Sequence, residues 1–461
     1  MAIVGAFMVP HPPMIVPAVG RGSEKQIEKT IAAYERVADE IAALKPETII
    51  ISSPHSVMYA DYFHISPGVK ATGSFAEFGA PQVKFEVNYD AELVNLLANK
   101  AMYTGFPAGC LGEKRKELDH GTMVPLWFIT KKYSDFKLVR TGLSGYDLLK
   151  HYEYGIMIKE AVSELDRRVV YVASGDLSHK LQEYGPYGFA EEGPEYDRRI
   201  MDVCSSARFG KLFDFDENFC NKAAECGHKS FVIMAGALDG TAVTATQYSH
   251  EDVTGVGYGI CSFIPKGTDE GRHFLDLKLA EEETALEEKK ARSDVYVKLA
   301  RASAEYYVKN KKVMKVPEWV PEELLNTKAG AFVSIHKFGA LRGCIGTILP
   351  TKNSLAEEII RNAVSAVSED NRFDPVEPEE LKWLDINVDV LESPEKIESE
   401  EQLDVKKYGV IVQSGHKRGL LLPDLDGVDT VEQQISIAMR KGGINPGSNI
   451  DLYRFEVVRH T

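Results

Sequence analysis

The hydrophobic positions at the start of the chain follow two patterns, short continuous runs and a helical period. Residues 3–9 and 48–51 are short apolar runs, typical of buried strands. Between them, residues 23–44 carry apolar side chains at helical spacing: Ile27, Ile31, Tyr34, Val37, Ala38, Ile41 and Leu44. A strand, a helix and a strand in this order predict a βαβ unit, with the two strands parallel in one sheet.

Each of these two strands leads into a Pro-His pair, which places a histidine just beyond the carboxyl end of the strand. Open α/β sheets bind their ligands at this edge. A later apolar run, residues 169–174, leads to a third histidine in the same way, and a fourth lies in a polar turn. Four histidines at related places indicate a functional site, and converging imidazoles indicate a metal. The four are His11, His55, His120 and His179.

The pattern of the chain changes near Pro265. Residues 265–292 are dense in charge, as in a solvated helix or a linker. Residues 293–461 then mix amphipathic helical segments with short alternating strands. We therefore expect an α/β domain over residues 1–264, with a mostly parallel central sheet flanked by helices, followed by a smaller α+β domain over residues 293–461.

Composition excludes several classes of function. The 461 residues contain 54 Lys and Arg against 69 Asp and Glu, a net charge of −15, which argues against broad nucleic-acid binding. Six scattered cysteines without CxxC pairs are typical of a reducing compartment. We see no basic leader and no apolar run near the roughly 20 residues that span a membrane. These features predict a cytoplasmic protein with neither nucleic acid nor membrane as a partner.

A metal held by two neutral imidazoles needs a negatively charged ligand as well. The best carboxylate is that of Glu225, between a turn of small residues and an apolar helix. Two histidines and one carboxylate form the facial triad of non-haem Fe(II), which leaves positions open for a substrate and O₂. Zinc could use the same residues with a bound water, as in a hydrolase. The residue types alone leave this choice open.

The order and spacing of these motifs resemble the class III (LigB-type) extradiol ring-cleavage dioxygenase superfamily, which also contains Memo-like proteins. The resemblance covers about residues 1–264. It rests on the segments Val9–Pro12, Ser53–His55, Leu118–Gly121 and Ser174–His179, and on Glu225 followed by Met234–Leu238.

This resemblance implies a reaction and a role for each residue. His11, His55 and Glu225 would bind Fe(2+), His179 would act as the general acid and base, and His120 would line the pocket. The implied reaction opens a catechol-type aromatic diol with O₂. Class III domains commonly pair with another subunit or with a copy of themselves, so a homo-oligomer is also implied.

One departure from the ring-cleaving pattern leaves the ligand set open. Memo-like proteins use a Cys-Gly pair where ring-cleaving members use glutamate, and this chain has both, in Glu225-Cys226-Gly227. We favour Glu225 because a carboxylate suits Fe(II). If Cys226 binds the metal instead, a redox or copper role is favoured over cleavage of a catechol. Asp119 and Asp176 either orient the imidazoles or cap turns and helices.

The second domain has a motif of its own. Residues 341–347 read LRGCIGT and resemble the AMMECR-type domain over about residues 293–461. Arg342 beside two glycines could bind an anion, and Cys344 could act as a nucleophile with His336 or His416 as its base. Alternatively, the glycines form a tight turn and the cysteine packs in the core.

The fusion of the two domains resembles the AmmeMemoRadiSam system protein A family, which is associated with a radical SAM protein. A metal-binding accessory protein that works with such an enzyme is therefore the alternative to a dioxygenase.

Overall fold

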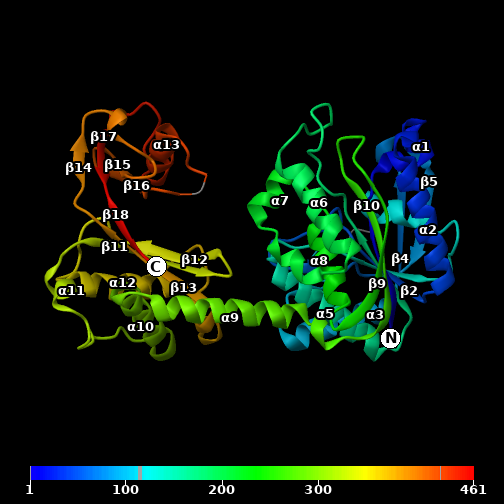
Figure 1. The fold of residues 1–461 in the computed structure, drawn as a ribbon, viewed down its shortest axis with the longest axis horizontal. Coiled ribbons are helices and arrows are strands. Elements are labelled where there is room, and N and C mark those ends of the chain that lie inside the picture. Colours follow the sequence, from blue (N-terminus) through cyan, green and yellow to red (C-terminus); the bar gives the residue numbers. More distant parts are fainter. Residues whose placement is uncertain (1, 113–116, 426) are drawn as a thin grey trace. The chain divides into compact units, whose positions relative to one another are not determined.

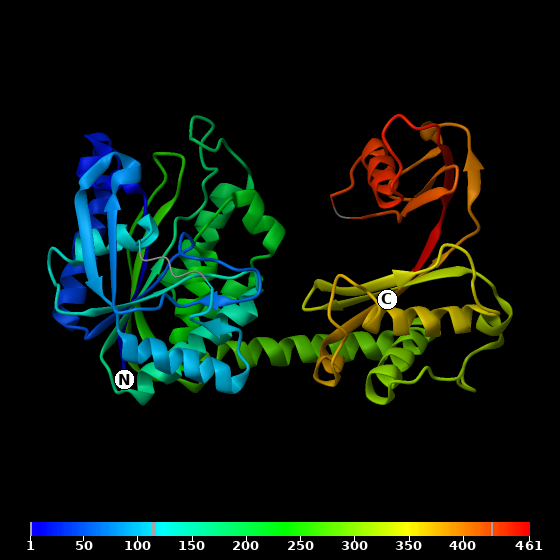
Figure 2. The same ribbon diagram turned by 180° about the vertical axis from the view of Figure 1, so that it is seen from behind.

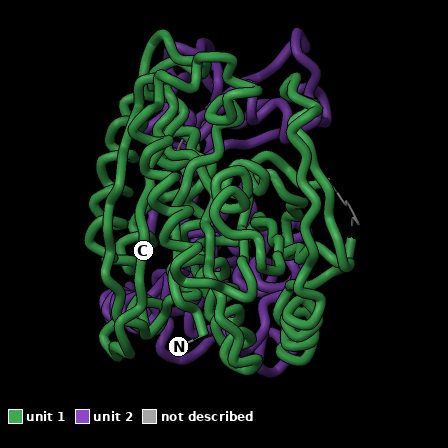
Figure 3. Tube along the Cα trace, turned by 90° about the vertical axis from the view of Figure 1, so that its right-hand side faces the viewer, with its two compact units in different colours: residues 1–278 green, residues 279–461 purple. Residues whose placement is uncertain are grey.

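The computed structural model describes residues 2–112, 117–425 and 427–461. The chain forms two compact units, residues 1–278 and residues 279–461, which Figure 3 shows in different colours. The expected order, an α/β domain before a smaller α+β domain, is confirmed. The charged segment predicted between the domains contains the helix α9 (Phe274–Arg292), in which only Leu275 is buried.

The first unit is built on a six-stranded sheet in the order β7-β2-β8-β1-β10-β9. The first four strands in this order are parallel, β10 runs antiparallel to β1, and β9 runs antiparallel to β10. The strands are β1 (Ile3–Val9), β2 (Thr48–Ser52), β7 (Lys137–Thr141), β8 (Val169–Ser174), β9 (Thr241–Glu251) and β10 (Tyr258–Thr268).

The predicted βαβ unit is present, with α2 (Glu28–Leu44) between β1 and β2. The two strands are parallel, as expected, but β8 lies between them and pairs with both. All strand residues of β2 and β8 are buried, which fits their continuous apolar sequences. The carboxyl ends of β1, β2 and β8 therefore meet at one edge of the sheet.

Helices cover both faces of this sheet (Figure 1). One face packs on α2 and α4 (His120–Ile129), and the other on α5 (Leu148–Glu164) and α8 (His228–Ala237). The remaining long helices of the unit are α3 (Ala91–Thr104), α6 (Glu192–Ser205) and α7 (Glu217–Ala223). The stretch Gly68 to Gly79 contributes β4 (Lys70–Phe75), paired with β5 (Ala80–Asn88) and seen in light blue in Figure 2.

The second unit has two antiparallel sheets. The sheet β12-β11-β13-β18 packs on α10 (Val295–Asn310) and α12 (Leu355–Ser368), and the sheet β14-β17-β15-β16 packs on α13 (Val431–Lys441). The strands of the first sheet are β11 (Gly330–Lys337), β12 (Ala340–Gly346), β13 (Leu384–Leu391) and β18 (Val457–His460). Those of the second are β14 (Glu395–Ile397), β15 (Gly409–Ser414), β16 (Lys417–Leu421) and β17 (Asp451–Phe455).

Candidate metal centre

Three side chains from distant parts of the sequence meet at the carboxyl edge of the first sheet. His11 follows β1, His55 follows β2, and Cys226 lies just before α8. The two histidine Nε2 atoms are 3.0 Å apart, and the Cys226 Sγ is 3.6 Å from the His11 Nε2. The three donor atoms all lie within 4.8 Å of one another, a spacing that one metal ion could bridge.

The ring of His11 is held so that its Nε2 faces this cluster. Its Nδ1 is 3.0 Å from the Oγ of Ser174, and that hydroxyl donates its own proton to the carbonyl of Gly121 at 2.6 Å. The Oγ therefore accepts from the Nδ1–H of His11, which leaves the lone pair on Nε2. This second partner is typical of a metal-binding imidazole.

Burial keeps the clustered histidines in their neutral form. It lowers the pKa of His11 well below 6.5, assisted by the nearby His55, His120 and His179. Burial and His55 lower the pKa of His120 to about 4 and that of His179 to about 4, and burial also lowers the pKa of His55. Neutral imidazole is the form that binds metals, so these residues fit a metal centre.

Cys226 is fixed by the turn that carries Asp176. The backbone N–H of Cys226 donates to the Asp176 carbonyl at 3.4 Å, and the Asp176 N–H donates to the Cys226 Sγ at 3.3 Å. Burial, with the nearby Asp176 and Glu225, raises the pKa of the Cys226 thiol well above 9.0. A metal that binds this sulfur must therefore displace its proton.

The position of Glu225 differs from our expectation. Its carboxylate accepts a hydrogen bond of 2.6 Å from the backbone N–H of His228, at the start of α8, and belongs to neither group of potential ligand atoms. Burial raises the pKa of this carboxyl group to about 7. Cys226 occupies the expected place instead, because its backbone is hydrogen-bonded to the turn at Asp176.

Close approach of two turns requires glycine at this point. A Cβ atom at Gly175 would lie 2.1 Å from the Cα of Gly227. The turn that carries Asp176 and His179 therefore touches the turn that carries Cys226 through bare backbone. These two glycines set the distance between Cys226 and the strand-end histidines.

His120 and His179 complete the cluster of four predicted histidines. His120 is the first residue of α4, rather than part of a turn, and Asp119 caps this helix by accepting from the N–H of Thr122 at 3.0 Å. The His120 ring centroid lies 3.9 Å from that of His55 and 5.4 Å from that of His11. The structure thus brings together all four histidines.

His179 belongs to a second group of potential ligands, which sequence reasoning did not identify. Its ring nitrogen, the carboxylate of Asp176 and the sulfur of Cys226 also lie within 4.8 Å of one another. From the sequence, Asp176 was expected either to orient an imidazole or to cap a turn, and not to bind a metal. An aromatic ring lies beside each of His120 and His179. The ring centroids of Phe78 and His120 are 5.3 Å apart, and those of Tyr187 and His179 are 5.1 Å apart.

The two candidates of the second unit have structural partners. Arg342 makes a two-pronged ion pair with Glu380, at 2.8 and 3.0 Å, which engages its guanidinium within the protein and favours the structural alternative for this residue. The Cys344 Sγ lies 3.2 Å from the Ser334 Oγ. Among the described residues, no recorded hydrogen bond joins Cys344 to either proposed base, His336 or His416.

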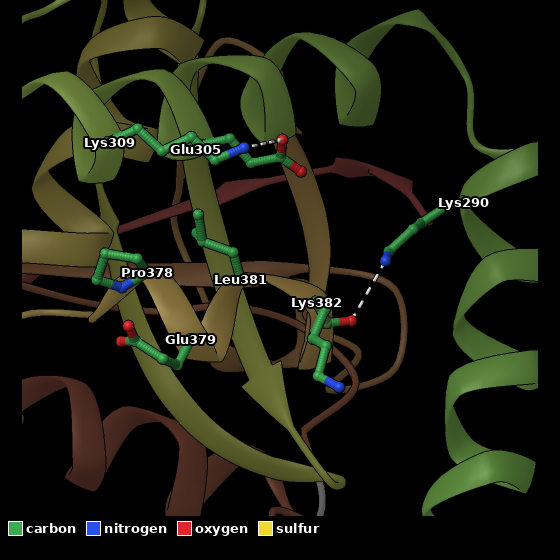
Figure 4. A pocket seen from close by; sticks show the side chains of 7 residues that line it. All are labelled: Lys290, Glu305, Lys309, Pro378, Glu379, Leu381 and Lys382. Carbon is green, nitrogen blue, oxygen red and sulfur yellow. Dashed lines mark hydrogen bonds and ion pairs between the residues drawn. The ribbon is translucent and has the colours of Figure 1, made fainter.

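A hollow of about 500 Å³ lies in the second unit (Figure 4). Its lysines are engaged by groups of the protein. Lys290 binds Glu287 at 2.8 Å and the carbonyl of Lys382 at 3.2 Å, and Lys309 lies 3.6 Å from Glu305. We assign it no role. Its lining residues are Lys290, Glu305, Lys309, Pro378, Glu379, Leu381 and Lys382.

Comparison with known proteins agrees with this architecture. Residues 5–261 match the model of the catalytic LigB subunit of aromatic ring-opening dioxygenase. The chain belongs to the LigB family. Residues 297–460 match the AMMECR1 model, so the second unit carries an AMMECR1 domain.

Relatives match either the whole chain or a part of it. A protein of Clostridium acetobutylicum is 40% identical over 468 residues, which cover all of this chain and 99% of that protein. A Thermotoga maritima protein is 53% identical over 167 residues, 36% of this chain and 96% of its own. A solved structure of an uncharacterized Pyrococcus horikoshii protein is 32% identical over 36% of this chain and 89% of that one, with a TM-score of 0.35. None of the described helices is long and apolar enough to cross a membrane.

Proposed function

We propose that the LigB-family domain is a Memo-like metal-binding centre that holds a redox-active transition metal, copper or ferrous iron, through His11, His55 and Cys226. One observation carries this proposal, the convergence of two imidazole nitrogens and one thiol sulfur within 4.8 Å. Two histidines with one cysteine are a donor set typical of copper, and imidazole also suits iron. In this role the protein serves as an accessory to a radical SAM enzyme in a modification pathway.

The residues around this centre have distinct tasks. When bound, the metal supplies a redox couple and a Lewis-acidic position. Ser174 holds the proton of His11 on Nδ1, so that Nε2 is ready to bind. Burial of His11, which is 1% exposed, excludes water from the inner side of the site. Burial lowers the pKa of His179 to about 4, so its ring is neutral and keeps a lone pair for a bound group.

Extradiol ring cleavage is the second candidate function, and a different observation favours it. His120 and His179 flank the donor set as an acid–base pair would, and Phe78 and Tyr187 lie beside them. Aromatic rings at these places offer flat surfaces against which an aromatic diol could stack. This function requires the metal to be Fe(II) and the second substrate to be O₂.

Metal binding and oxygen uptake separate the two functions. Full-length protein is loaded anaerobically with Cu(I) or Fe(II), and bound metal is counted in the wild type, in Cys226→Ala and in Glu225→Gln. The Memo-like centre predicts loss of metal in Cys226→Ala alone, without oxygen uptake on a panel of catechols. Metal loss in Glu225→Gln alone, with catechol-dependent uptake, would reject it in favour of the dioxygenase.

The partner is tested separately. The purified chain and a radical SAM protein from the same genome are mixed, and complex formation is measured by analytical ultracentrifugation. We expect a complex with the metal-loaded wild type. Its absence at micromolar concentrations would reject the accessory role and leave the metal centre intact.

A further inference from the structure

Two groups of ligand atoms in the LigB-family domain share a single atom, the sulfur of Cys226. The first group adds the imidazoles of His11 and His55, and the second adds the carboxylate of Asp176 and the imidazole of His179. Within each group, all ligand atoms lie within 4.8 Å of one another. Each group therefore has the size of one metal site.

A single ion does not account for all five donors. Two ligands that bind one ion at about 2.3 Å each lie at most about 4.6 Å apart. Among the described residues, however, the donors form two groups of three rather than one group of five, so at least one pair across the groups is separated by more than 4.8 Å. An ion bound by one group thus leaves a donor of the other group beyond its reach.

We propose that the LigB-family domain holds two metal ions, with the thiolate of Cys226 as the bridge between them. His11 and His55 complete the first position, and Asp176 and His179 complete the second. The first position rests on the proposed function above, and the second goes beyond it. Thiolate sulfur has several lone pairs, so it can bind two ions at once, and its charge offsets the repulsion between them.

The second position has the features of a ligand set rather than of a hydrogen-bonded core. The Nε2 of His179 is buried and has no hydrogen-bond partner among the described groups. A buried ring nitrogen without a partner is costly unless something else binds it. The Asp176 carboxylate is held in place by the His11 N–H, which donates to its Oδ1 at 2.7 Å.

The fold also fixes the two positions relative to each other. The backbone N–H of His11 binds Asp176, while the N–H of Cys226 binds the Asp176 carbonyl at 3.4 Å. Asp176 therefore connects the two groups through its backbone and its side chain. A change in one position is expected to be felt at the other.

Zinc is a suitable probe because it binds sulfur, nitrogen and oxygen donors and has no redox chemistry. Metal-free, full-length protein is titrated with Zn(II), bound zinc is counted by elemental analysis and native mass spectrometry, and the loaded protein is studied by X-ray absorption. We expect two zinc ions per chain, with a zinc–zinc distance of at most about 4.6 Å, twice the Zn–S bond length.

Variants assign each ion to its group. His179→Gln and Asp176→Asn should each retain one ion and lose the zinc–zinc signal, and His55→Gln should also retain one. His273→Gln is the matched control, since His273 pairs with Asp239 at 2.6 Å outside both groups, and it should retain two. Thermal unfolding of the metal-free variants checks that each is folded. Asp176→Asn conserves volume and the acceptor for the His11 N–H, so it guards against a folding defect.

The outcomes separate this inference from the proposed function. Saturation of the wild type at one ion that Cys226→Ala loses would overturn the second position and leave the proposed function standing. If His179→Gln binds as many zinc ions as the wild type and also keeps the zinc–zinc signal, the inference is overturned as well. Binding of no ion at all would overturn both.

Discussion

Replacement of Gly175 by alanine tests whether close contact of two turns builds the metal centre. A Cβ at this position would lie 2.1 Å from the Cα of Gly227, whereas two carbon atoms pack at about 3.5 Å or more. The two turns would have to separate by about 1.4 Å, the difference between these values. Gly175→Ala should therefore move Cys226 away from His11, whose Nε2 now lies 3.6 Å from the sulfur.

Metal ligands tolerate far smaller displacements, since bond lengths at such sites vary by only about 0.2 Å. We expect the affinity for zinc to fall by about 100-fold or more. This is the upper end of the loss of metal affinity seen when residues that hold metal ligands in place are replaced. The free energy of unfolding of the metal-free protein should fall by about 1–3 kcal/mol, as for other overpacked sites. Competition with a chromophoric chelator measures the affinity, and urea unfolding measures the stability.

Gly271→Ala is the control for this experiment. A Cβ at Gly271 would meet only the Asp269 Oδ1, at 3.3 Å, a side-chain atom that can move. Its metal affinity should equal that of the wild type. If Gly175→Ala also binds zinc with wild-type affinity, the contact between the turns does not set the geometry of the centre, and the reasoning fails.

Three further changes have defined outcomes. Ser174→Ala removes the acceptor that holds the Nδ1 proton of His11, so zinc affinity should fall by about 10–100-fold in the same chelator assay; an unchanged affinity would contradict this. Asp119→Ala removes the cap of α4 and should lower the free energy of unfolding by about 1–2 kcal/mol in urea; equal midpoints for variant and wild type would contradict this. Burial opposes the charge of Glu380, but hydrogen bonds, chiefly from Arg342, outweigh it and lower its pKa from 4.5 to about 2. Glu380→Gln should therefore destabilise the AMMECR1 domain by on the order of 1–2 kcal/mol at pH 7, where this stabilisation is complete, and the difference should shrink as the pH falls from 4.5 toward 2. Pulsed hydrogen exchange of peptides from that domain measures the difference in stability between the variant and the wild type. A difference that persists at pH 2 would show that the ion pair is not its cause.

Much of the fold follows from local patterns in the sequence. Continuous apolar runs and a helical period are properties of neighbouring residues, and they correctly predicted β1, α2, β2 and β8. The gathering of His11, His55, His120 and His179 at one edge also followed, since parallel strands share their carboxyl edge. The order of the strands did not follow, because the place of β8 between β1 and β2 depends on pairing between distant segments.

The sequence by itself determined that this chain carries histidines at the strand ends of an α/β domain, with a glutamate and a cysteine next to each other further on. Only the tertiary structure decided which of these two neighbours faces the histidines. Cys226 does so because its backbone is hydrogen-bonded to Asp176, 50 residues earlier, where Gly175 and Gly227 let the two turns touch. Glu225, one residue before, is turned to the start of α8. Adjacent residues point in different directions, and the contact between segments far apart in the chain selects the one that enters the site.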